Sequence, residues 1–277
     1  MEIKAKVISV PRSLGEENQD GYYINLEKGV FAVLDGVSGS DDGKFACDFI
    51  KEELEKRSDQ IYRLTGIFPS HVKKEVDAMD SLLFQKNQEV GKGALTTLSL
   101  LAFSKGTKNA TVTNAGDSRI YRYRKRDFYF EQISRDDSFV FFKEKLKREK
   151  VDPSKLTDKQ RYKIQNDLDN ATQKSDLDKD ELWFWDKRGN ITNAMGNGRL
   201  KQDTRGFKFK EDDVFVLMTD GVYDNLPHKE MQKIVKENKD DIGTIVDLLF
   251  QRALEESTSS SFRASHDDIT VIGIKIE

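Results

Sequence analysis

The chain has 277 residues, 34% of them charged, and a formal net charge of −3. This length suits one large domain or two small ones, and the slightly negative charge argues against a nucleic-acid-binding surface. Cys47 is the only cysteine, which excludes an internal disulfide framework and a thiolate zinc site. No apolar run is long enough to span a membrane, and the first residues lack the pattern of a signal peptide, so we expect a cytoplasmic protein.

The first third of the chain predicts strands followed by two helices. The expected strands are Lys4–Val10, Tyr22–Leu26 and Val30–Leu34. The helix that follows has an apolar face formed by Phe45, Phe49, Ile50 and Leu54. A second helix is expected from about Ser70, the candidate N-cap, to about Glu89. Two helices after paired strands favour a layer of helices on a sheet.

The rest of the chain returns to strand patterns and ends with two helices and a strand. Strands are expected at Ala94–Phe103, Ala110–Asn114, Ser118–Tyr123, Phe128–Ile133, Val214–Met218 and Asp268–Ile276. Helices are expected at Glu230–Val235 and Ile242–Leu254. Because this order does not alternate strand with helix, it predicts an antiparallel α+β layer fold.

A charged segment extends from Asp136 to about Gly189. Its densest piece, Lys143–Lys150, mixes both signs, which favours a solvated helix face over a binding patch. The aromatic run Trp183-Phe184-Trp185 interrupts the segment. We interpret this run as an anchor that packs the segment onto the domain, and the alternative is a contact surface for a protein substrate.

Four strand-like runs each have an aspartate at one end. Asp35 follows Val30–Leu34 and is itself followed by Gly36, and Asp220 stands in the same position after a second apolar run. Asp267 and Asp20 precede two further runs. One Asp-Gly pair alone is typical of a tight hairpin turn. If the four ends meet, however, their carboxylates form a cluster, and hard divalent cations are the usual compensation for such a cluster.

Several short motifs along the chain together resemble those of one known family. The matching pieces begin with Glu17-Asn18-Gln19-Asp20, Asp35-Gly36-Val37-Ser38-Gly39, Gly93-Ala94-Leu95-Thr96-Thr97 and Asn114-Ala115-Gly116-Asp117-Ser118-Arg119. They continue with Ser134-Arg135-Asp136-Asp137-Ser138, Ala194-Met195-Gly196, Thr219-Asp220-Gly221-Val222-Tyr223-Asp224 and Asp267-Asp268-Ile269-Thr270-Val271. In their number and order, these pieces specifically resemble the metal-dependent type 2C serine/threonine protein phosphatases, in particular the bacterial-type members. This resemblance implies an α+β fold in which a central β-sandwich of two antiparallel sheets is flanked by helix pairs. It covers nearly the whole chain and implies a single phosphatase domain over residues 1–277, with a charged, flap-like insert at about 137–190.

The resemblance also implies a site for two Mn²⁺ or Mg²⁺ ions. Asp35 resembles the carboxylate that bridges them, and Gly36 would lend its carbonyl oxygen to one ion. Asp220 and Asp267 match the other metal-binding aspartates, so that Asp35 and Asp220 are the residues on which catalysis is expected to depend. Asp20 matches a group that holds metal-bound waters.

Two further roles follow from the resemblance, and two positions depart from it. Asp136 matches a position that binds a third ion together with Asp220. The arginine that binds the substrate phosphate in many members would fall at Gly15, so Arg12 is the nearest candidate. Val37 stands where many eukaryotic members have a histidine that acts as a general acid. The turn at Asn114–Arg119 is interpreted as structural.

The implied reaction is hydrolysis of phosphoserine and phosphothreonine by in-line attack of a metal-bridging hydroxide. The implied partners are a phosphorylated protein substrate and a cognate serine/threonine kinase, with no nucleic acid and no membrane. The alternative is a catalytically silent phosphatase-like domain that binds phosphoproteins or a signalling regulator. An aspartyl-phosphate mechanism is rejected because Val37 and Val222 stand where its second aspartate is required.

Overall fold

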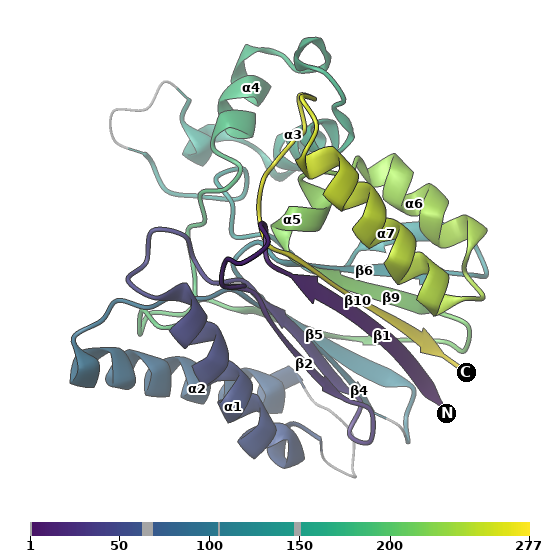
Figure 1. Cartoon of the computed structure of the whole chain (residues 1–277). Helices are drawn as coiled ribbons and strands as arrows, with labels where there is room; N and C mark the ends of the chain where they lie inside the picture. Colours follow the sequence, from purple (N-terminus) through teal and green to yellow (C-terminus); the bar gives the residue numbers. More distant parts are fainter. Residues whose placement is uncertain (1, 63–68, 105, 147–150) are drawn as a thin grey trace.

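The computed structural model describes residues 2–62, 69–104, 106–146 and 151–277, and its centre is a sandwich of two five-stranded sheets (Figure 1). All the strand pairs in both sheets are antiparallel. The first sheet has the order β1, β10, β9, β6, β7 (Ile3–Val10, Ile269–Ile276, Val214–Met218, Arg119–Arg124, Tyr129–Gln132). The second has the order β2, β3, β4, β5, β8 (Gly21–Asn25, Val30–Leu34, Leu98–Ser104, Asn109–Ala115, Asp203–Lys208).

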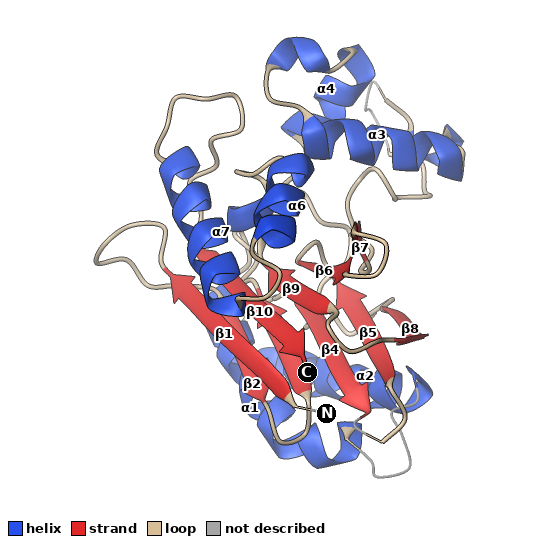
Figure 2. Ribbon diagram, turned by 90° about the vertical axis from the view of Figure 1, so that its right-hand side faces the viewer, coloured by secondary structure: helices blue, strands red, loops and turns tan. Residues whose placement is uncertain are grey.

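Helices cover the outer face of each sheet (Figures 1 and 2). The second sheet is covered by α1 and α2 (Gly43–Ile61, Pro69–Val90), and the first by α5, α6 and α7 (Asp220–Tyr223, His228–Glu237, Ile242–Ser257). The predicted α+β architecture of two antiparallel sheets between helix pairs is therefore confirmed. Among the helices that the structure describes, none combines the length and the apolar character needed to cross a bilayer.

Strand β3 explains why its sequence is continuously apolar. Val30, Ala32 and Leu34 face the helix layer, and Phe31 and Val33 face the other sheet. Successive side chains of a strand point to opposite faces, so a strand in the middle layer of such a fold must be apolar on both. The side chain that follows Leu34 is directed by the same alternation toward the space between the two sheets, at the edge of the sandwich.

Several predicted boundaries shift, and four elements were not predicted. The strand expected at Ala94–Phe103 begins only at Leu98, because before it only Thr96 pairs, in isolated bridges with Gly36 and Met195. The unpredicted elements are β8, the single-turn helix α5, and the helix pair of the insert, α3 and α4 (Asp158–Asn170, Lys179–Asp186). Residues 143–146 are not helical, in contrast to the prediction for Lys143–Lys150, and residues 147–150 lie outside the described part.

The insert has a small core of its own, placed at one end of the sandwich (Figure 1). Trp185 is 5% exposed and stacks on Phe262, with ring centroids 4.3 Å apart. Phe262 belongs to the loop between α7 and β10. The aromatic run therefore anchors the insert to the body of the protein, as the first of the two interpretations predicted.

Candidate active site

Three buried strands meet at one edge of the sandwich, each next to an aspartate. Asp35 follows β3, Asp220 begins α5 two residues after the end of β9, and Asp267 lies just before β10. Strands β9 and β10 are antiparallel neighbours, so the end of one lies beside the start of the other. Strand β3 packs against both across the sandwich. The topology thus brings together the carboxylates that the sequence placed at strand ends.

These carboxylates raise one another's pKa values. Burial raises the pKa of Asp35 well above its usual range, and Asp220, Asp20 and Asp267 add to the shift by charge repulsion. Burial also raises the pKa of Asp220, and Asp267 is its strongest charged neighbour. The pKa of Asp267 is raised by burial in the same way. Such a cluster cannot be fully ionised at neutral pH unless cations compensate it.

Asp20 is fixed at this edge by threonine hydroxyls. The Thr219 hydroxyl donates to Oδ2 of Asp20 over 2.8 Å, and the backbone N–H of Thr270 donates to the Thr219 oxygen over 3.1 Å. Burial raises the pKa of Asp20 to about 8, against hydrogen bonds from both threonines that lower it. Asp20 is therefore connected to the end of β9 and the start of β10, next to the other three carboxylates.

The glycine after each of two aspartates is required by close backbone packing. A Cβ at Gly36 would lie 2.7 Å from the carbonyl carbon of Gly43, at the start of α1. A Cβ at Gly221 would lie 1.9 Å from the carbonyl oxygen of Asp268. Both distances are far below van der Waals contact. The pair Asp35-Gly36 is therefore a strand-to-loop junction packed against a helix start, and not a hairpin turn.

Asp268 holds the loop that contains Arg12. Its two carboxylate oxygens accept backbone hydrogen bonds from Arg12 over 2.7 Å and from Gln19 over 2.6 Å. The Arg12 guanidinium is half exposed and donates to Glu16 over 2.6 Å. Arg12 lines the same cleft as Asp35. The predicted phosphate-binding arginine thus lies at the acidic edge, although its side chain is paired with Glu16 in this structure.

Asp117 is a member of the cluster that the sequence analysis assigned to a structural turn. It lies between β5 and β6, is 5% exposed, and its charge raises the pKa values of Asp35 and Asp220. Burial raises the pKa of Asp117 itself to about 7. The preceding Gly116 has a φ of +93°, and a Cβ there would lie 2.6 Å from the Thr97 side chain. The signal that could have identified Asp117 is an aspartate shortly after a strand, although β5 contains several polar residues and is not a continuous apolar run.

The residues at this edge fit hard divalent cations. All the donors are oxygens, and Oδ1 of Asp220 is buried without a hydrogen-bond partner among the described residues. In the described parts of the chain, no three acidic, histidine or cysteine side chains already converge as the ligands of one ion. Mg²⁺ keeps several waters and uses only one or two carboxylates, so it does not require such a convergence.

Solved structures of other proteins match this chain over nearly its whole length. A family model described as Stage II sporulation protein E (SpoIIE) matches residues 192–277, whereas a search of curated proteins finds no match. PppA of Pseudomonas aeruginosa, described as a key regulatory component of T6SS, is 20% identical with a TM-score of 0.71, covering 100% of this chain and 99% of PppA. The serine/threonine phosphatase PstP/Ppp of Mycobacterium tuberculosis is 18% identical with a TM-score of 0.72 and full coverage of both chains. A PstP catalytic domain in complex with 2 manganese ions is 17% identical, with a TM-score of 0.72 and coverage of 99% and 98%.

The chain has the bacterial type 2C phosphatase fold. At these identities the likeness establishes the fold, and the function must be argued from the site. Because the alignments cover 99% of this chain or more, they include the insert as well as the two sheets.

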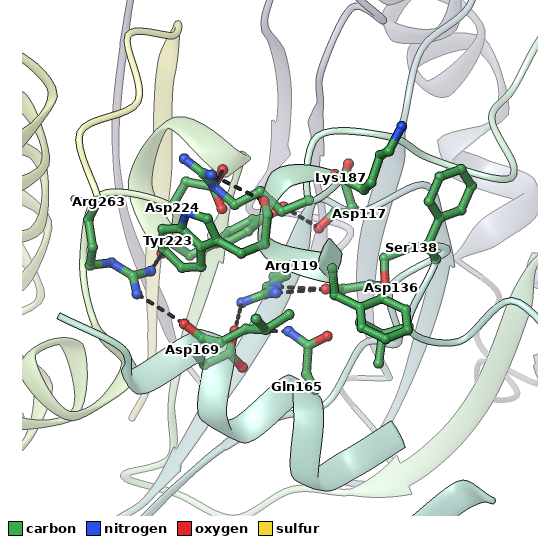
Figure 3. A pocket seen from close by; sticks show the side chains of 16 residues that line it. Asp117, Arg119, Asp136, Ser138, Gln165, Asp169, Lys187, Tyr223, Asp224 and Arg263 are labelled. Carbon is green, nitrogen blue, oxygen red and sulfur yellow. Dashed lines mark hydrogen bonds and ion pairs between the residues drawn. The ribbon is translucent and has the colours of Figure 1, made fainter. Parts of the chain in front are cut away.

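In this type 2C fold, Asp136 borders the carboxylate cluster as the strongest charged neighbour of Asp117, but its own carboxylate is paired with an arginine. It is 2% exposed and accepts from Nε and Nη2 of Arg119 at 2.9 and 2.8 Å (Figure 3). Gln132 donates to its other oxygen over 2.6 Å. Burial raises the pKa of Asp136 to about 6 even so, because desolvation outweighs the arginine charge. Its role at a third ion stays a prediction, and Asp117, whose charge raises the pKa values of Asp35 and Asp220, is a second candidate for that role.

The same arginine connects the insert to the body of the type 2C fold (Figure 3). Nη1 of Arg119 donates to Asp169 of α3 over 3.0 Å. Arg263, from the loop before β10, donates to two backbone carbonyls at the end of α3, and Arg188 pairs with Asp224 over 2.9 Å. Asp224 follows α5 and contributes to the raised pKa of Asp220. The insert therefore supplies positive charge close to the cluster.

Proposed function

We propose that this protein is a metal-dependent phosphatase that hydrolyses phosphoserine and phosphothreonine in proteins. The observation that carries the proposal is the cluster of Asp35, Asp220, Asp267 and Asp20 at one edge of a type 2C sandwich, with one Asp220 oxygen buried and unpartnered. The chain would act as one phosphatase unit, because Arg119 and Arg263 bind its insert to the sandwich. A serine/threonine kinase that produces the substrate is the expected partner.

Mn²⁺ or Mg²⁺ is the expected cofactor, as two ions with a third beside them. Asp35, the carbonyl of Gly36, Asp220 and Asp267 would hold the first two ions, and Asp117 or Asp136 would help hold the third together with Asp220. When bound, the ions would make a water nucleophilic near neutral pH and offset the charge of the phosphoryl oxygens. The manganese complex of the PstP catalytic domain supports this choice of metal.

Residues of this chain would orient the attacking water and bind the negatively charged phosphate group. Asp20, held by Thr219, keeps a fixed acceptor beside the cluster that can orient a water molecule. Asp268 fixes the backbone of the loop that bears Arg12, so the guanidinium can turn from Glu16 to a substrate phosphate that enters the cleft. Arginine suits this role because its planar fork matches two phosphate oxygens.

The test is hydrolysis of an aryl phosphate by metal-stripped protein with and without added Mn²⁺. Turnover should require the metal, and Asp35→Asn and Asp220→Asn should each lower it by at least about a hundredfold, because each removes a charge from the cluster. Asp59→Asn is the matched control, because Asp59 is 78% exposed on α1 and pairs with Lys28. Mn²⁺ should raise the melting temperature of the wild type and of Asp59→Asn, and much less that of the two site variants.

Turnover in excess chelator, or near-wild-type turnover of folded Asp35→Asn, would refute this proposal. A stripped protein that is stabilised by Mn²⁺ yet hydrolyses no phosphate monoester would favour the alternative, a catalytically silent domain that binds phosphoproteins or a signalling regulator.

A further inference from the structure

A groove with a basic rim begins beside the candidate active site. Its rim carries Arg135, Lys143, Arg199 and Lys201, and its apolar wall is formed by Phe141 and Phe142. We call it the basic groove. Its volume is about 580 Å³, against about 30 Å³ for the cavity of Figure 3, so it has room for several side chains of an extended peptide.

Backbone hydrogen bonds fix this groove relative to the carboxylate cluster. The N–H of Asp137 donates to the carbonyl of Gly116 over 2.8 Å, and the N–H of Gly116 donates to Oδ2 of Asp137 over 3.0 Å. Asn193 donates to the same carboxylate oxygen over 2.7 Å. Because Gly116 immediately precedes Asp117, the groove begins one residue away from the cluster. The Asp137 carboxylate also interacts with the charge of Arg135. The groove is lined by four basic and two acidic side chains, so its formal charge stays positive, at +2.

The positive charges of the rim are weakly compensated. Among the residues that the structure describes, the Arg199 side chain has no ion-pair partner. Lys201 lies 3.9 Å from Glu144, and both side chains are more than 70% exposed. Lys143 lies 3.5 Å from Asp158, again with both side chains exposed. Exposed pairs of this kind contribute little and exchange readily with a better anion.

We propose that the basic groove binds acidic residues that flank the phosphorylated residue of a protein substrate. This proposal rests on the proposed phosphatase function and deepens it by naming a substrate class. The carboxylate cluster by itself attracts positively charged sequences, whereas the groove beside it has the opposite sign. A substrate with glutamates or aspartates next to its phosphoserine or phosphothreonine matches both the metal-loaded site and the groove. Phe141, with Arg135 stacked over its ring at 5.1 Å, offers the apolar surface on which such a segment can lie.

The experiment compares three phosphothreonine peptides that differ only in the flanking residues, which are glutamates, glutamines or lysines. Each kcat/KM is divided by the turnover of a small aryl phosphate by the same protein. The glutamate peptide should exceed the glutamine peptide by about threefold or more at low salt. This ratio should fall toward one in Arg199→Glu/Lys201→Glu, and it should also fall as salt is raised.

The control variant is Arg126→Glu/Lys208→Glu, which makes the same change of charge in a second basic surface. Arg126 follows β6 and Lys208 ends β8, at the ends of these strands that lie away from Asp117. This variant should keep the peptide preference of the wild type. No preference for the glutamate peptide, or a preference that survives in Arg199→Glu/Lys201→Glu or is lost equally in the control, would overturn the proposal.

A second measurement separates this proposal from the proposed function. Fluorescence anisotropy follows the binding of a labelled, unphosphorylated glutamate peptide and requires no turnover. Weaker binding to Arg199→Glu/Lys201→Glu than to the control supports the groove even in a preparation that hydrolyses no aryl phosphate. Equal binding to both variants refutes the groove, whereas absent aryl phosphate turnover refutes only the phosphatase activity.

Discussion

Replacement of Gly221 by alanine tests the packing between the two segments that contain Asp220 and Asp267. Gly221 follows Asp220 in the first turn of α5, and a Cβ there would lie 1.9 Å from the carbonyl oxygen of Asp268. Real Cβ contacts essentially never fall below 3.0 Å, so the start of α5 and the start of β10 would have to separate by about 1 Å. The opposing atom belongs to the backbone, and no side-chain rotation can relieve the clash.

The cost can be bounded from known effects of overpacking. Alanine in a helix gains up to about 1 kcal/mol over glycine, and overpacking of a rigid site costs about 1–3 kcal/mol or more. Because the clash here is between two backbones, we expect a net loss of about 2–3 kcal/mol. For a chain of this size, that loss lowers the melting temperature by about 3–5 °C. The separation also moves Asp267 away from Asp220, so aryl phosphate turnover should fall by at least about tenfold.

The matched control is Gly189→Ala, because a Cβ at Gly189 meets no atom within 4 Å. Its melting temperature and turnover should stay close to those of the wild type. Both variants are measured by calorimetry with chelator and with Mn²⁺, together with turnover. If Gly221→Ala melts within about 1 °C of the wild type and keeps its activity, the packing argument for the Asp-Gly pairs is wrong.

Three further predictions follow from the buried charges. Arg119→Met should lower the free energy of unfolding by about 3–5 kcal/mol in urea, because it leaves Asp136 buried without its partner; a loss below about 1 kcal/mol would contradict the pairing. In excess chelator, the melting temperature should fall as the pH rises from about 5 to about 8, because Asp20 (pKa about 8) and Asp117 (pKa about 7) hold protons in the folded state that they release on unfolding. Mn²⁺ should remove this slope, and a melting temperature that rises with pH in chelator would refute the clustering. Asp268→Ala should raise KM for an aryl phosphate more than it lowers kcat, because it frees the loop that bears the phosphate-binding candidate; an unchanged KM would exclude that role.

The strands could be predicted because the sandwich buries both faces of its central strands. Val30–Leu34 and Val214–Met218 are apolar throughout, and the structure places both between two packed layers. An aspartate one or two residues after such a run must lie at the edge of the sheet, so Asp35 and Asp220 could be identified from the sequence alone. Helix α2 could be predicted for a similar reason, since its buried residues repeat at helical spacing.

Pairings between distant residues could not be predicted in this way. Asp136 is buried against Arg119 of the neighbouring strand, and nothing in the local sequence distinguishes a paired carboxylate from a metal ligand. Strand β8 was not predicted because it is a mostly exposed edge strand with polar residues on both faces. The insert helix α3 was not predicted because its only buried residues are Arg161, Ile164 and Leu168, which are too few to give a clear apolar stripe.

Ion pairs join the insert to the rest of the protein, and they argue against regarding the insert as a separable flap. Asp224 is 8% exposed, adds to the raised pKa values of Asp220 and Asp267, and is compensated by Arg188 at the end of the insert. Arg119, which balances Asp136, also reaches into α3. A shift of the insert therefore changes the electrostatic environment in which the cluster holds its protons or its metal ions. Substrate contact at the insert and the charge state of the cluster are linked through these ion pairs, so a protein substrate that moves the insert would alter the site that acts on it.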